Sequence, residues 1–135
     1  MAETDAHSTG DSTLLSRLEP GLLVAVGGFA GAISRYGVAV VLPGGFPWGT
    51  LAVNVVGSFV LGVLLYEARL LGLLSEKTRL VLGTGFLSSF TTYSTFAVQT
   101  VALSPTMAVA NVAANYVLGF AAVLAGRAAV RRANR

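Results

Sequence analysis

The chain has 135 residues, of which 54% are hydrophobic and only 11% are charged. A soluble domain usually carries about 25% charged residues, so this composition excludes an ordinary water-soluble domain and predicts one embedded in a membrane. The net charge of +3 does not indicate a nucleic-acid partner, because the basic residues flank apolar runs, and the lack of cysteine excludes disulfides.

The first segment, residues 1–19, is polar and carries four of the six acidic residues, which are Glu3, Asp5, Asp11 and Glu19. A secretory signal begins with positive charge and leads into an apolar stretch with a small-residue cleavage site. We therefore interpret residues 1–19 as a disordered cytosolic tail and not as a cleaved signal. Residues 20–127 are predicted to form one membrane domain, followed by a basic cytosolic C-terminal tail at 128–135.

Four stretches then approach the roughly 20 apolar residues that a helix needs to cross a bilayer. They are residues 21–42, residues 48–66 or as far as 74, residues 80–103 and residues 105–126. The connections carry turn chemistry, with PGGFP at 43–47, a charged loop at 69–79 and a tight turn at Ser104-Pro105. The sequence thus predicts an all-α membrane protein with four transmembrane helices.

The basic residues indicate how these spans are oriented. With four spans, the two termini and the second loop lie on one side, and eight of the nine Lys and Arg residues fall there. They are Arg17, Arg69, Lys77, Arg79, Arg127, Arg131, Arg132 and Arg135. The exception is Arg35, inside the first span. The positive-inside rule therefore predicts that both termini are cytoplasmic in a multi-pass protein of the cell membrane.

Polar side chains recur within the spans. Two spans carry them at a spacing of four residues, which places them on one helix face. They are Thr50, Asn54 and Ser58 in the second span and Asn111, Asn115 and Gly119 in the fourth. In the third span, residues 88–95 (SSFTTYST) include six Ser or Thr in eight positions. Because hydroxyls at this density compete for backbone hydrogen bonds, we predict a broken third helix near the membrane midplane.

The polar groups in these spans argue against several classes of function. With the second span ending at residue 66, none of the four predicted stretches contains Asp, Glu, His or Lys, which argues against proton relays and embedded cation sites. No nucleophile and base pair can be assembled, so we do not predict an enzyme. Amides, hydroxyls, aromatic ring edges and Arg35 remain, and this chemistry suits a small anion. Taken singly, these side chains also fit helix packing, as does Gly27-xxx-Gly31.

Several ordered motifs resemble the Fluc/CrcB family of fluoride channels. They are residues 27–32 (GGFAGA), Arg35-Tyr36, residues 49–62 (GTLAVNVVGSFVLG), Gly85-Phe86 and residues 91–96 (TTYSTF). The resemblance covers about residues 21–126. It implies a four-helix subunit that pairs antiparallel into a dimer, which conducts fluoride passively and holds a central sodium ion at the break of the third helix.

The resemblance also implies roles for individual residues. Asn54 corresponds to the pore asparagine that hydrogen-bonds fluoride, and Tyr93 and Phe96 to the two aromatic positions whose ring edges line the path, with Ser94 and Thr95 between them. Asn111 and Asn115 occupy the fourth-helix positions of the pore. Arg35 corresponds to a vestibule position, and its spacing equally fits an arginine that reaches the headgroups. Ser88 and Thr91 stand where the family donates backbone carbonyls to sodium.

The chain departs from the usual family pattern at several of these positions. Ser88-Ser89 replaces Gly-Gly, Tyr93 replaces Phe, and Asn111 and Asn115 replace a Tyr and a Ser. These departures and the one-sided charge favour an antiparallel heterodimer with an oppositely oriented homologue over a homodimer. The alternatives for function are a small multidrug-resistance-type exporter, which needs a Glu within a span, and a non-conducting membrane assembly subunit, which needs no Asn54 beside an aromatic pair.

Overall fold

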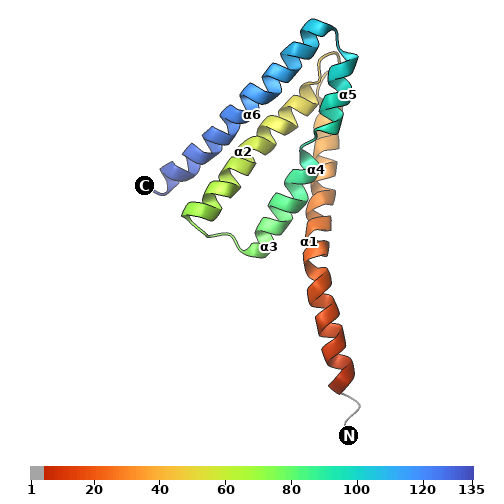
Figure 1. The fold of residues 1–135 in the computed structure, drawn as a ribbon, viewed down its shortest axis with the longest axis vertical. Helices are drawn as coiled ribbons and strands as arrows, with labels where there is room; N and C mark the ends of the chain where they lie inside the picture. The colour runs from red at the N-terminus through yellow and green to blue at the C-terminus, as the bar shows by residue number, and fades with distance from the viewer. Residues whose placement is uncertain (1–4) are drawn as a thin grey trace.

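The computed structural model describes residues 5–135, and every regular element within them is a helix (Figure 1). The elements are α1 (Asp5–Val41), α2 (Trp48–Leu70), α3 (Glu76–Arg79), the π-helix η1 (Leu80–Leu87), α4 (Ser88–Phe90), α5 (Ser94–Ala102) and α6 (Pro105–Ala133). The predicted all-α class is confirmed for this part of the chain.

Three of these helices are long and apolar enough to cross a membrane. They are the Ser16–Val41 part of α1, all of α2 and all of α6. The stretch at 80–103, predicted as one span, consists of η1, α4 and α5 in sequence, and the chain is extended at Thr91, with ψ of 160°. The predicted break in the third helix is therefore present, within the Ser- and Thr-rich run.

The helices extend further than the sequence indicated. Residues 5–19, which we expected to be disordered, form the beginning of α1, while residues 1–4 lie outside the described part. Glu19 pairs with Lys77 and ties this end of α1 to α3. Likewise α6 continues to Ala133, through most of the expected C-terminal tail.

The helix α2 is longer than residues 48–66 and contains a buried acid. The prediction that the spans carry no acidic residue is therefore wrong for α2. Glu67 lies 7% exposed near the end of α2. Its Oε1 accepts a hydrogen bond from the backbone N–H of Leu74 at 2.8 Å, and its Oε2 lies 3.5 Å from Nη2 of Arg79. This carboxylate therefore holds the loop that leads from α2 to α3.

The turns form where the sequence placed them, because local chemistry decides them. Gly45 in the turn after α1 and Gly72 after α2 adopt φ of 101° and 61°, which favours glycine. Ser75 caps α3 by accepting from the Thr78 N–H at 3.2 Å, and Pro105 occupies the first turn of α6, where its missing N–H costs nothing.

Glycines allow two pairs of helices to approach with their backbones in contact. α1 packs against η1 and α4, where Gly27 and Gly31 face the backbone of Val81 and Phe86. α2 packs most extensively against α6, where Gly62 faces the backbone of Val123. A Cβ at any of these glycines would overlap a backbone atom of the neighbouring helix. This is the close packing of small residues that membrane helices use.

The beginning of α1, the end of α6 and the loop between α2 and α3 lie toward the same end of the bundle, and the turns at 42–47 and 103–104 lie at the other (Figure 1). The eight Lys and Arg residues outside the first span consequently cluster at one end.

Candidate functional site

The side chain of Asn54 on α2 binds the backbone of the broken helix. Its Oδ1 accepts a hydrogen bond from the N–H of Thr92 at 2.9 Å, and its Nδ2 donates to the carbonyl of Thr92 at 3.2 Å. In an unbroken helix the N–H of Thr92 would donate to the carbonyl of Ser88, four residues earlier. Asn54 therefore takes the place of the helical partners that the break removes.

The same amide begins a chain of hydrogen bonds that runs along α6. Nδ2 of Asn54 also donates to Oδ1 of Asn115 at 3.1 Å, and Nδ2 of Asn115 donates to the carbonyl oxygen and to Oδ1 of Asn111 at 3.0 and 3.1 Å. Nδ2 of Asn111 then donates to Oγ1 of Thr100 on α5 at 2.8 Å. Asn111 is completely buried. Three asparagines that the sequence singled out are therefore brought into one connected network.

Thr92 is the centre of the break and was not singled out as a site residue. Its Oγ1 accepts from the N–H of Thr95 at 3.2 Å and donates to Oγ1 of Thr95 at 3.0 Å, so that it caps the start of α5. Its side chain is buried. Ser94, by contrast, is exposed, with its Oγ 3.5 Å from that of Thr92.

The two aromatic rings predicted to act together do lie together. The ring centroids of Tyr93 and Phe96 are 5.9 Å apart at an interplanar angle of 45°. Their surroundings differ, because Phe96 is 8% exposed and Tyr93 is 73% exposed. The Tyr93 ring therefore lies at the surface of the single chain.

A hollow of about 440 Å³ opens beside Asn54, between α2 and the broken helix. Its polar lining consists of Asn54, Ser58, Ser88, Thr91, Thr92 and Tyr93. The lining contains hydroxyls, an amide and an aromatic ring, and it contains no acidic or basic side chain. These groups can donate hydrogen bonds to a small anion without first binding a cation.

Arg35 lies in a second hollow, of about 240 Å³, where α1 faces α2 and α5. The polar residues around Arg35 are Thr50, Thr92, Thr95 and Gln99, and Oγ1 of Thr50 donates to Oε1 of Gln99 at 2.6 Å. Within the described side chains, Arg35 forms no ion pair. The structure therefore separates Arg35 from the Asn54 hollow, and Thr92 borders both.

Ser88 and Thr91 lie at the end of the first half of the broken helix. Their hydroxyls bond back to helical carbonyls, that of Ser88 to Thr84 and to Gly85 at 3.0 Å, and that of Thr91 to Leu87 at 2.9 Å. The last carbonyls of a helix lack intrahelical donors, and the Thr92 N–H that would serve Ser88 is directed to Asn54. These backbone oxygens are therefore suitable ligands for a hard cation such as sodium.

The sequence missed Thr92 and Thr100 of the network, and also Gln99, which pairs with Thr50. Gln99 carried a usable signal, since it is the only glutamine of the chain and stands in an otherwise apolar run. No signal in the sequence identified Thr92 or Thr100, because a hydroxyl gives no indication of whether it bonds within its own segment or to another helix.

Comparison with known proteins relates this chain to one family. Residues 22–127 match the family described as CrcB-like protein, Camphor Resistance (CrcB). A protein of Natronomonas pharaonis named fluoride-specific ion channel FluC 1 is 62% identical over 109 residues, which cover 81% of this chain and 92% of the relative. A protein of the same name from Haloarcula marismortui is 56% identical over 121 residues, covering 90% and 93% of the two chains. Fluoride-specific ion channel FluC 2 of Halobacterium salinarum is 58% identical over 107 residues, covering 78% and 82%.

Proposed function

Because this chain belongs to the CrcB-like protein family, we propose that it is a fluoride-selective ion channel that lowers cytoplasmic fluoride passively, as one subunit of a dimer. The observation that carries the proposal is the 62% identity to a fluoride-specific ion channel of which the chain covers 92%. With four membrane crossings, the broken segment η1–α4–α5 is the third, in addition to the three helices long enough to span.

The hydrogen-bond chemistry around Asn54 supports a fluoride path. Fluoride accepts hydrogen bonds, and both amide hydrogens of Asn54 are donated, one to the Thr92 carbonyl and one to Oδ1 of Asn115. We infer that a passing fluoride replaces Oδ1 of Asn115 as an acceptor, while the Thr92 N–H keeps Asn54 in position at 2.9 Å. The ring edges of Tyr93 and Phe96, which carry partial positive charge, supply further contacts.

The shape of the site supports a dimer. The hollow beside Asn54 is open at the surface of the single chain, and the Tyr93 ring on its rim is 73% exposed. A pore needs walls on all sides, so a second subunit is required to close this hollow and to cover Tyr93. An antiparallel arrangement agrees with the family resemblance.

Fluoride efflux from liposomes that contain this purified chain, alone or together with an oppositely oriented homologue, tests the function directly. With the homologue present we expect rapid efflux of fluoride and much slower efflux of chloride, read with ion-selective electrodes, whereas rapid efflux from the chain alone would indicate a homodimer. Absence of fluoride efflux from the chain alone, followed by efflux when an oppositely oriented homologue is added, would identify a heterodimer. Absence in both cases contradicts the channel proposal.

We further propose that sodium binds at the end of α4, through the backbone carbonyls of Ser88 and Thr91. The free acceptor capacity of these oxygens supports the assignment. The ion would fix the two halves of the broken helix relative to each other. Asn54 also stabilises this arrangement by binding the backbone of Thr92.

Replacing Ser88 by glycine tests the backbone character of the sodium site. The Ser88 hydroxyl bonds only to carbonyls of its own helix, so Ser88→Gly leaves the proposed ligands in place. We expect fluoride efflux and sodium-dependent thermal stabilisation equal to or above those of the parent. Loss of the sodium-dependent stabilisation in a well-folded Ser88→Gly protein would show that the side chain, and not the backbone, holds the ion.

The charge distribution supports a fixed orientation in the cell membrane, with both termini in the cytoplasm, and therefore a heterodimer. A chain that inserts both ways in equal amounts needs a nearly even Lys and Arg balance across the membrane. Here eight of nine lie toward one end, four of them on the last turns of α6 and just beyond.

A cysteine at the exposed C-terminal position Asn134 reports this orientation, because the chain has no other cysteine. We expect Asn134→Cys to be protected from an impermeant thiol reagent in intact cells and to react fully after the cells are opened. A cysteine at Gly44, in the exposed turn at the opposite end, is the matched control and should react in intact cells. Labelling of about half the molecules at both positions would instead establish dual orientation and the homodimer.

A further inference from the structure

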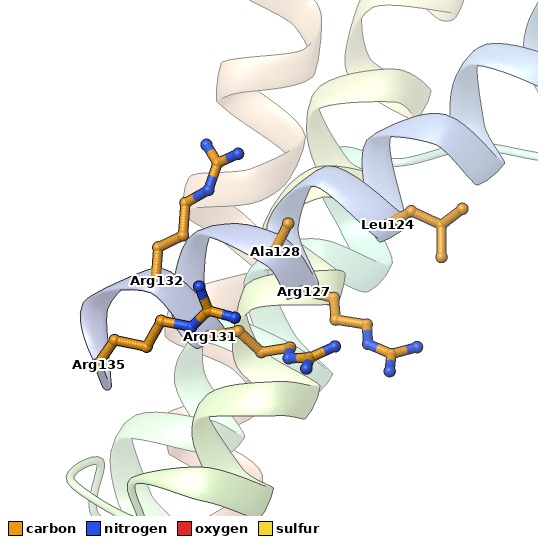
Figure 2. A pocket seen from close by; sticks show the side chains of 6 residues that line it. All are labelled: Leu124, Arg127, Ala128, Arg131, Arg132 and Arg135. Carbon is orange, nitrogen blue, oxygen red and sulfur yellow. The ribbon is translucent and has the colours of Figure 1, made fainter.

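Four arginines lie on the last turns of α6 or just beyond its end and line an open hollow of about 520 Å³ together with Leu124 and Ala128 (Figure 2). Arg127 and Arg131 are spaced by four residues, which places them along one face of the helix, and Arg135 follows just after the helix ends at Ala133. Figure 2 shows Arg127 and Arg131 extending from α6 in the same direction, whereas Arg132 points to another side. The fluoride path beside Asn54 does not use any of them.

None of the described side chains forms an ion pair with these arginines. Both carboxylates with ion pairs in the described part of the chain are taken by other residues, Glu19 by Lys77 and Glu67 by Arg79. Arg127 is held over the ring of Tyr66, with its Cζ 4.9 Å from the ring centroid. The side chains of Arg131 and Arg135 are exposed, so their guanidinium groups are available to an anion from outside the chain.

The position of the cluster along α6 indicates where such an anion would come from. A bilayer core about 30 Å thick is crossed by about 20 helical residues, and counting from Pro105 this length ends at Leu124. The helix has 29 residues, so its last two turns extend beyond the hydrocarbon into the headgroup layer. Leu124, which is 59% exposed, lies on the hydrocarbon side of the hollow, and the arginines lie on the aqueous side.

From this arrangement we propose that the C-terminal face of α6 binds the phosphate headgroup of an anionic membrane lipid. The planar guanidinium groups of Arg131 and Arg135 bind the phosphate oxygens, since arginine matches phosphate with paired hydrogen bonds. An acyl chain of the same lipid lies against Leu124. Juxtamembrane basic residues gain affinity for anionic leaflets in this way.

The proposal is tested by measuring lipid binding to the full-length protein in a neutral detergent by native mass spectrometry. The probes are a short-chain phosphatidylglycerol, the matching phosphatidylcholine and inorganic phosphate. The test variant is Arg131→Gln with Arg135→Gln, and the control is Arg17→Gln with Arg69→Gln, which removes two exposed charges elsewhere. Arg127 is left in place because it packs on Tyr66.

We expect phosphatidylglycerol to bind the parent and the control equally and the test variant about thirty-fold more weakly, from about five-fold per arginine. Arg131→Lys with Arg135→Lys, which keeps the charge, should lose only part of the affinity. Equal binding of phosphatidylcholine, unchanged binding to the test variant, or an equal loss in the control would overturn the site. Displacement of the lipid by an equal concentration of inorganic phosphate would assign the arginines to a soluble anion instead. Fluoride is absent from the assay, so its outcome is independent of the channel proposal.

Discussion

Asn54→Asp is expected to reduce fluoride efflux from liposomes by at least about two orders of magnitude. The substitution removes the amide donor and places a carboxylate against two acceptors, the Thr92 carbonyl and Oδ1 of Asn115, which lie at 3.2 and 3.1 Å from Nδ2. It also puts a negative charge on the proposed fluoride path, and two like charges about 4 Å apart repel by about 4 kcal/mol near a protein surface. The carboxylate still accepts from the Thr92 N–H, so part of the clamp on the break remains.

Phe96→Ile distinguishes the loss of the ring edge from a loss of folding. Phe96 and Phe90 are each 8% exposed, and each belongs to a ring pair, Phe96 with Tyr93 and Phe90 with Phe86. The same substitution at either position removes a comparable buried ring. We expect Phe96→Ile to reduce efflux strongly and Phe90→Ile to keep it, with both proteins eluting as the parent does on size exclusion. Parental efflux from a well-folded Asn54→Asp or Phe96→Ile protein would refute the pore assignment.

Gly31→Ala is expected to lower the stability of the protein strongly. A Cβ at Gly31 would overlap the backbone carbonyl of Phe86, and a backbone atom cannot move aside as the end of a side chain can. The helix α1 must then shift away from η1 and α4. Overpacking of this kind costs about 1–3 kcal/mol and sometimes more. A lower midpoint of thermal unfolding in detergent would register it.

Gly37→Ala is the matched control, because Gly37 lies in the same helix and a Cβ there meets no atom of the chain within 4 Å. It should unfold at or above the temperature of the parent protein, because alanine is the better helix former. If the two variants proved equally stable, the close backbone contact between α1 and η1 would not contribute to the stability of the protein.

Much of the fold was predictable because it depends on local chemistry. Apolar length predicted the three helices that are long enough to cross a membrane, and Pro, Gly and Ser predicted the turns, since each of these signals acts within a few residues. The break at Thr91–Tyr93 was predictable for the same reason, from hydroxyl density. The ends of the helices were not, because the ion pair between Glu19 and Lys77 and the role of Glu67 in its loop join residues distant in the sequence.

The site was predictable to a smaller extent. Four-residue spacing brought Asn111 and Asn115 onto one face, but it could not show that Asn54 would contact Asn115 or the backbone of Thr92. These contacts depend on how closely α2 approaches α6 and the break, and glycines at the crossings determine that distance. The backbone atoms that Gly31 contacts likewise depend on how the helices pack. Side-chain chemistry can be read along the sequence, whereas the pairing of donors with acceptors requires the tertiary structure.

The glycine crossings also have a mechanical consequence. Backbones in contact cannot slide past one another without separating, so α2 with α6 form one stiff block and α1 with η1 and α4 form another. Direct contacts between the two blocks are sparser, and the hydrogen bonds of Asn54 to Thr92 cross the seam. Thermal motion should therefore concentrate along this seam as a small hinge about Asn54. The amide that we propose to bind fluoride therefore also joins the two blocks, so a fluoride ion that displaced one of its hydrogen bonds would act at the seam between them.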